Sequence, residues 1–120
     1  MGTLRFEDQK IPHTIDEYAT LAEQFIPGRR AIFAIVESAL LELLPEGQLR
    51  ILVVGAGGGE EILRLGENNP DWSFVGVDTY EPMVALARKR LAETSVGARS
   101  RVETLAIDAL GDRGFDAATC

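Results

Sequence analysis

The feature of the sequence that most constrains the fold is an apolar run that leads directly into a cluster of glycines. Residues 49–54 (LRILVV) end in four consecutive apolar residues and so predict a strand buried on both faces. The segment GAGGGEE follows at once, and Ile62, Leu63 and Leu65 then mark the inner face of a helix over residues 59–68. A buried strand joined to a helix by a glycine turn is typical of a parallel sheet.

A second strand and helix follow in the same order. Residues 72–77 (WSFVGV) form an apolar run that ends at Asp78. Thr79 is suited to cap the next helix, which has Pro82 in its first turn. The apolar positions of that helix share one face and comprise Met83, Val84, Leu86, Ala87 and Leu91.

The pattern continues to the end of the sequence. Residues 101–107 (RVETLAI) alternate in polarity and predict a third strand ending at Asp108, and residues 115–120 (FDAATC) begin a fourth. Strands that alternate with helices predict right-handed crossovers between parallel strands. We therefore expect an α/β fold, a Rossmann-like doubly wound parallel sheet that is truncated after about four strands and preceded by two helices.

Two helical patterns precede the first strand. The first lies within residues 14–25 and ends at Pro27 and Gly28. The second, over residues 29–44, is apolar on nearly every side, so we expect it to be covered on more than one face. The apolar positions of the first helix are Ile15, Tyr18, Leu21, Ala22 and Phe25.

Composition and charge exclude several classes of function. The 12 Lys and Arg residues are outnumbered by 19 Asp and Glu residues, and the net charge of -7 makes nucleic acid a poor partner. The basic groups at residues 29–30 and 88–90 are interpreted as solvated helix faces. Cys120 is the only cysteine, which excludes an internal disulfide and a cysteine metal cluster and favours a cytoplasmic location. No apolar stretch is long enough to span a membrane.

The polar residues at the predicted strand ends indicate a ligand site. The glycine turn, Asp78 and Asp108 would meet at the carboxyl edge of the sheet, where ligands bind in open α/β folds. The dinucleotide pattern G-x-G-x-x-G fails here, because Glu60 occupies its last position. Glu60 and Glu61 would also repel a pyrophosphate at the helix N-terminus, each by about 0.3–1 kcal/mol. A plain turn at the glycines, a helix cap at Asp78 and turn chemistry at Asp108 remain alternatives.

A nucleoside without phosphates removes the conflict of charge. The Asp78 carboxylate suits two ribose hydroxyls, and Asp108 with the backbone N–H of Ala109 suits the edge of adenine. The close backbone at residues 55–57 would serve a small amino-acid group. These features together point to S-adenosylmethionine, which is cationic at its sulfonium.

At these residues the sequence resembles the class I S-adenosylmethionine-dependent methyltransferases. The segments ILVVGAGGGEE, WSFVGVDTYEPMVALARKRL, VETLAIDAL and FDAATC are similar to successive motifs of that family, from residue 49 to the end. Val53 departs from the family, which often has an acid at this position. By resemblance, the methionine group would lie against Gly55, Ala56 and Gly57, the ribose would bind Asp78, the adenosine would be bordered by Thr79 and Met83, and adenine would bind Asp108 and Ala109.

The resemblance implies one compact domain with two parts. Residues 1–48 would form a helical lid or preamble, and residues 49–120 an incomplete S-adenosylmethionine-binding core. The implied function is methyl transfer to a small molecule, with no metal and with catalytic groups located beyond the fourth strand. We also expect a homodimer or larger assembly through the fourth-strand edge or the helix at residues 29–44. The alternatives are a catalytically silent, truncated cofactor-binding or dimerisation module and a nicotinamide-dependent oxidoreductase.

Overall fold

The computed structural model describes residues 28–120, so the helix expected within residues 14–25 lies outside the described part. No helix in residues 28–120 is long and apolar enough to cross a membrane. The elements in chain order are α2 (Arg29–Leu43), β1 (Leu49–Val54), α3 (Glu60–Asn68), β2 (Trp72–Asp78), α4 (Glu81–Ala92), the 3-10 helix η2 (Ser95–Arg99), β3 (Ser100–Thr104), the 3-10 helix η3 (Ile107–Ala109) and β4 (Ala117–Thr119).

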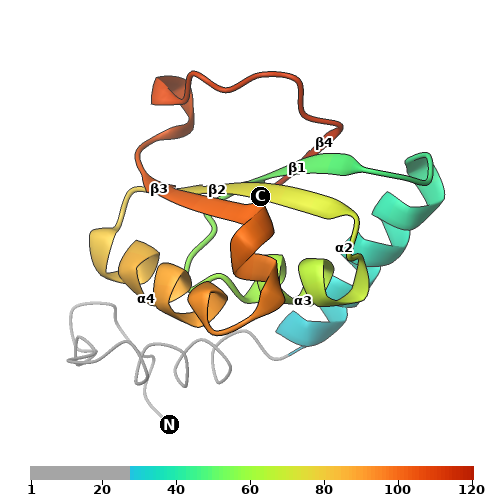
Figure 1. The fold of residues 1–120 in the computed structure, drawn as a ribbon, viewed down its shortest axis with the longest axis horizontal. Coiled ribbons are helices and arrows are strands. Elements are labelled where there is room, and N and C mark those ends of the chain that lie inside the picture. Colours follow the sequence, from blue (N-terminus) through green and yellow to red (C-terminus); the bar gives the residue numbers. More distant parts are fainter. Residues whose placement is uncertain (1–27) are drawn as a thin grey trace, which may run out of the picture.

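The four strands form one parallel sheet in the order β3-β2-β1-β4. Helices α2, α3 and α4 lie on one face, and the connection between β3 and β4 crosses the opposite face (Figure 1). Because β2 and β3 extend the sheet to one side of β1 and β4 to the other, the strand order reverses between β1 and β4. This arrangement confirms the predicted Rossmann-like α/β fold and places a topological switch point at the end of β1.

The core lies between the sheet and the helices. Ile51 and Val53 of β1 are 0% and 1% exposed and pack in one cluster with Phe74 of β2 and with Ile62 and Leu65 of α3. On the other face of β1, Leu52 is also buried. The expectation that β1 is buried on both faces is therefore confirmed.

Gly76 lets the first turn and helix approach the sheet closely. A Cβ at this position of β2 would lie 2.8 Å from Ile62 Cδ1 and 2.9 Å from Ala56 Cβ. Both distances are shorter than ordinary van der Waals contact, so only glycine fits without movement of α3 or of the glycine turn.

The third strand is shorter than the sequence predicts. It pairs with β2, and its last residue, Thr104, lies opposite the last residue of β2, Asp78. Beyond Thr104 no strand among residues 28–120 offers a further partner, and the Leu105 N–H donates to the Asp78 carbonyl at 3.0 Å as the chain turns away. The prediction that Asp108 ends this strand is wrong, because Asp108 lies in the 3-10 helix η3.

The predicted cap of α4 is also wrong. The N-cap residue is Tyr80, and no side chain among residues 28–120 caps the helix. Asp78 acts instead from the end of β2, where its Oδ1 accepts a hydrogen bond from the Tyr80 N–H at 2.9 Å. Asp78 at the end of β2 therefore orders the turn before α4, where Thr79 was expected to act as the cap.

Helix α2 is less buried by neighbouring elements than its apolar composition predicts. Leu40 is its only buried residue, and Ile32, Ile35 and Leu43 are 51%, 68% and 81% exposed. Within residues 28–120 the helix is thus covered on one face only, against α3 and the core. The exposed side forms an apolar stripe, which we define as Ile32, Ile35, Leu41 and Leu43.

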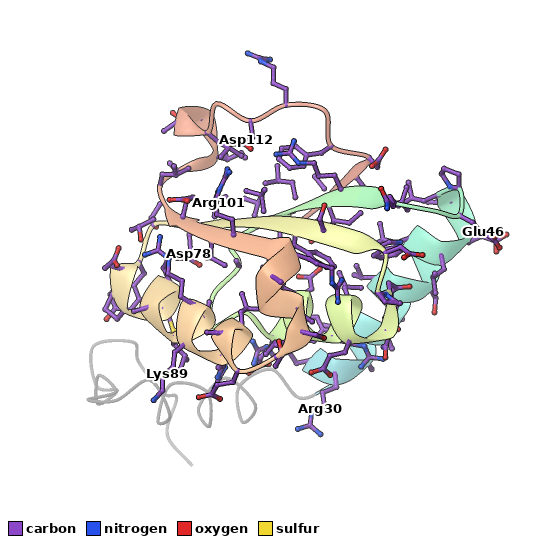
Figure 2. The ribbon with its side chains drawn as sticks, in the orientation of Figure 1. Arg30, Glu46, Asp78, Lys89, Arg101 and Asp112 are labelled. Carbon is purple, nitrogen blue, oxygen red and sulfur yellow. The ribbon has the colours of Figure 1, made fainter. Side chains whose placement is uncertain are left out.

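An ion network holds the β3–β4 connection on the open face of the sheet. Asp112 accepts hydrogen bonds from Arg101 of β3 and Arg50 of β1, both at 2.6 Å. Figure 2 shows Arg101 and Asp112 on the side of the sheet opposite the helices. The hydrogen bond from Arg101, together with Arg50, lowers the pKa of Asp112 below its ordinary value of 3.8.

Candidate functional site

A cleft of about 370 Å³ lies at the carboxyl ends of β1, β2 and β4. Hollows of about 480 Å³ between α4, η2 and β3 and of about 540 Å³ between α2 and α3 are larger, but neither adjoins these strand ends. The cleft has the volume and the position of a small-ligand site in an open α/β sheet. It is lined by Arg29, Phe33, Gly55, Ala56, Gly57, Glu60, Glu61, Asp78, Tyr80, Met83 and Cys120.

The glycine turn lines the cleft and is held against β2. Gly55 and Gly57 adopt φ angles of +69° and +54°, which residues with a Cβ seldom adopt. Between them, the Ala56 N–H donates to the Val77 carbonyl at 2.9 Å. The turn therefore presents backbone rather than side chains to a ligand, in a fixed position beside the end of β2.

Asp78 joins the two turns that border the cleft. Its Oδ2 accepts a hydrogen bond from the Gly57 N–H at 2.9 Å, while its Oδ1 accepts one from the Tyr80 N–H at 2.9 Å. A carboxylate has about four acceptor positions, so two remain for donors from a ligand. The side chain is half-buried and is held by both contacts in one orientation.

The charge of Glu60 is balanced by two arginines. Its carboxylate lies 3.0 Å from Arg29 of α2 and 3.7 Å from Arg90 of α4. Arg90 also donates to the Gly58 carbonyl at 3.3 Å, so the network ties both helices to the glycine turn. The expected repulsion of a phosphate by Glu60 is correspondingly smaller than its formal charge indicates.

The basic groups at residues 29–30 and 88–90 were interpreted as solvated helix faces. This interpretation is wrong for Arg29 in the first group and for Arg90 in the second. The side chains of Arg29 and Arg90 are only 20% and 28% exposed and belong to the network around Glu60. Arg30 and Lys89 are exposed, and Figure 2 shows both pointing away from the body of the molecule.

Unlike the charge of Glu60, the charge of Glu61 is balanced by no arginine of the described residues. Its Oε1 is buried, and no hydrogen-bond donor of the described chain reaches it. Glu61 thus brings an unpartnered acceptor to the lining of the cleft.

The structure brings together five of the eight residues predicted to bind the cofactor. They are Gly55, Ala56, Gly57, Asp78 and Met83, all of which line the cleft. Thr79 is exposed beside it, while Asp108 and Ala109 are exposed in η3, outside the lining. These last two lie apart because β3 ends four residues before Asp108. Within residues 28–120 no group of acidic, histidine or cysteine side chains could hold a metal ion.

Six lining residues are absent from the predicted cofactor-binding set: Glu60 and Glu61, which were expected only to repel a phosphate, and four others. Arg29 and Phe33 reach the cleft because α2 packs beside α3, and Cys120 because β4 pairs with β1. Tyr80 lies two residues after the predicted strand end at Asp78. Only Tyr80 carried a local signal, since the other three depend on how distant segments pack.

A family described as a methyltransferase domain matches residues 52–120. A stretch of 41 residues is 42% identical to a tRNA (guanine-N(7)-)-methyltransferase of Synechococcus sp. (strain JA-3-3Ab), and covers 34% of this chain and 17% of that relative. The chain therefore aligns with only a small part of the curated relative.

Solved structures share the fold. The [4+2]-cyclase SpnF is 25% identical with a TM-score of 0.64, over 78% of this chain and 36% of its own. A SAM-dependent methyltransferase from Thiobacillus denitrificans, in complex with S-adenosyl-L-homocysteine, is 20% identical with a TM-score of 0.62, over 92% and 43%. The family match spans more than half of the chain and covers the end of β1 and all of β2, β3 and β4, so the protein belongs to the class I S-adenosylmethionine-dependent methyltransferase family.

Proposed function

We propose that the cleft binds S-adenosylmethionine and that the chain supplies the cofactor-binding part of a methyltransferase. The observation that carries the proposal is the position of Asp78, which lines the cleft at the end of β2 and is hydrogen-bonded to the glycine turn at the end of β1. Family membership supports the choice of cofactor.

In this proposal each part of the cleft contacts a different part of the cofactor. The two acceptor positions left on Asp78 would receive the ribose hydroxyls. The backbone of residues 55–57 would border the amino-acid group, and Met83, which is 7% exposed, would pack against the adenosine. Thr79 would border the adenosine from the outer side of the cleft.

Adenine would be held by Asp108 and Ala109. Both lie outside the cleft lining, but the segment that leads to them begins at Leu105, whose N–H is bonded to the Asp78 carbonyl at 3.0 Å. A ligand that extends past Asp78 would therefore meet residues 105–109. The exposure of Asp108 and Ala109 leaves both free to contact it.

When bound, S-adenosylmethionine supplies a sulfonium-activated methyl group. Methyl transfer of this kind is driven largely by the positions of donor and acceptor. The contribution of this chain is to orient the cofactor, since Asp78 and the glycine turn are held rigidly relative to one another.

A small molecule is the acceptor that we propose. The net charge of -7 supports it, because an acidic protein repels a polyanion. The similarity of a short stretch to tRNA methyltransferases favours nucleic acid as the alternative. Transfer of labelled methyl groups to a small-molecule fraction, and not to an RNA fraction, would support the proposal.

We also propose that residues 1–48 act as a lid and residues 49–120 as the core. We propose further that the protein works in the cytoplasm as a homodimer or larger assembly. The position of Arg29 and Phe33 in the cleft supports the first division. The apolar stripe of α2 and the free edge of β4, which pairs only with β1 among the described strands, support self-association.

Calorimetry with S-adenosylmethionine, S-adenosylhomocysteine and NAD tests the function. We expect both adenosyl compounds to bind and NAD to bind far more weakly. The variant Asp78→Asn should weaken S-adenosylhomocysteine at least about tenfold, since hydrogen bonds to a charged group contribute about 1.5–3 kcal/mol. Asp71→Asn, an exposed change outside the cleft, is the matched control and should bind normally.

The outcomes separate the alternatives. Preferential binding of NAD would favour an oxidoreductase. No binding of any of the three compounds at millimolar concentration would favour a catalytically silent module.

A further inference from the structure

We propose that Glu61 is a specificity-determining residue that holds the α-ammonium group of the amino-acid part of the ligand. The inference rests on the proposed function and deepens it, because it names the chemical group that this side chain selects. Glu61 is the second residue of α3 and lines the cleft.

The unpartnered oxygen of Glu61 is the first observation. Its Oε1 is buried, yet no donor within residues 28–120 reaches it. Folded proteins leave few buried polar atoms without a partner, because such an atom loses its hydrogen bonds to water and gains none in exchange. An oxygen of this kind in the lining of a ligand cleft indicates that a ligand supplies the donor.

The contrast with Glu60 is the second observation. Glu60 occupies the same helical turn, but Arg29 and Arg90 lie within 3.0 Å and 3.7 Å of its carboxylate. None of the ion pairs among residues 28–120 involves Glu61. The dipole of α3 favours a negative charge at Glu61 but provides no hydrogen bond to Oε1.

The charges around Glu61 select the kind of donor. An ammonium group carries a positive charge and three N–H donors, so it matches a carboxylate better than a neutral hydroxyl or amide does. Arg29 lines the same cleft, where its guanidinium already pairs with the Glu60 carboxylate at 3.0 Å. The α-carbon of an amino acid carries an ammonium group, and Glu61 brings to the cleft lining an acceptor oxygen that no described donor reaches.

The same arrangement works against a phosphorylated ligand. A phosphate near the start of α3 would approach Glu61, whose charge no arginine of the described residues balances. Glu61 would therefore help to distinguish an adenosyl amino acid from a nucleoside phosphate.

The test compares two ligands that differ only in the ammonium group. Calorimetry would measure Kd for S-adenosylhomocysteine and for its analogue in which hydrogen replaces the α-amino group, with wild type and with Glu61→Gln. We expect wild type to bind S-adenosylhomocysteine at least about tenfold more tightly than the analogue, about 1.4 kcal/mol. Glu61→Gln should weaken S-adenosylhomocysteine by about the same factor and bind the two ligands almost equally.

Glu67→Gln is the matched control, because it makes the same chemical change at an exposed position of α3 outside this cleft. It should bind both ligands as wild type does. Thermal unfolding without ligand should show at most a small loss of stability in Glu61→Gln, since the change removes only the favourable interaction of a charge with the dipole of α3.

The results also distinguish this inference from the function on which it rests. Unchanged affinity of Glu61→Gln for S-adenosylhomocysteine, or equal weakening of both ligands, would refute the role of Glu61 and leave the proposed function standing. Failure of wild type to bind S-adenosylhomocysteine would overturn the proposed function and this inference with it.

Discussion

Replacement of Gly76 by alanine tests whether close packing of the glycine turn on β2 shapes the cleft. The added Cβ would lie 2.9 Å from Ala56 Cβ, whereas ordinary contact begins at 3.4 Å. The difference requires a shift of roughly 0.5 Å, the gap between those two distances. Ala56 cannot rotate away because its Cβ is attached directly to the backbone, so the turn itself must move.

The expected cost is moderate. Overpacking of a filled core costs about 1–3 kcal/mol, and a second contact, at 2.8 Å from the buried Ile62, adds to the strain. Replacing glycine by alanine lowers the conformational entropy of the unfolded chain, which recovers about 0.4–1 kcal/mol of stability. We therefore expect a net loss on the order of 1–2 kcal/mol, which lowers the Tm of a domain of this size by roughly 5–10 °C.

Thermal and urea unfolding of Gly76→Ala measure this loss, and calorimetry measures the accompanying change in affinity for S-adenosylhomocysteine. Gly111→Ala is the control, because its Cβ would meet nothing within 4 Å and its φ is not positive. The control should stay within about 0.5 kcal/mol of wild type. An unchanged Tm for Gly76→Ala, or an equal fall in both variants, would refute the packing argument.

Two further predictions concern the ion network and the apolar stripe of α2. Asp112, whose pKa is lowered chiefly by Arg101, stabilises the fold above pH 3.8 and loses this effect as pH falls through its lowered pKa. The Tm of Asp112→Asn should therefore fall less steeply below pH 4 than that of wild type; parallel curves would contradict this. Ile35→Glu, at a position 68% exposed, should reduce the sedimentation mass to that of a monomer, and a wild type that is already monomeric at micromolar concentration would contradict self-association.

The strands, turns and helices within residues 28–120 could be predicted because their signals are local. The apolar run before Gly55 and the glycines after it specify a buried strand and a left-handed turn without reference to the rest of the chain. Asp78 was placed correctly at a strand end for the same reason. Its two hydrogen bonds to separate turns could not be predicted, because they depend on how β1 and β2 align.

The errors arose where pairing or packing overrides local pattern. Residues 101–107 alternate like a strand throughout, but β3 stops at Thr104 because β2 offers no partner beyond Asp78. From the sequence Arg29 is expected to belong to a solvated basic pair, but in the structure it forms an ion pair with Glu60 where α2 contacts α3. A sequence pattern carries no information about which distant side chain lies opposite.

The sequence by itself determined the order of elements, the glycine turn and the acid at the end of β2, since each follows from the conformational preferences and burial of neighbouring residues. Only the tertiary structure decided which residues share the cleft. The strand order β3-β2-β1-β4 brings Cys120 beside the glycine turn, and the packing of α2 brings in Arg29 and Phe33. The physical reason is that contacts between distant segments depend on sheet register and helix packing, and these are settled by the whole core at once.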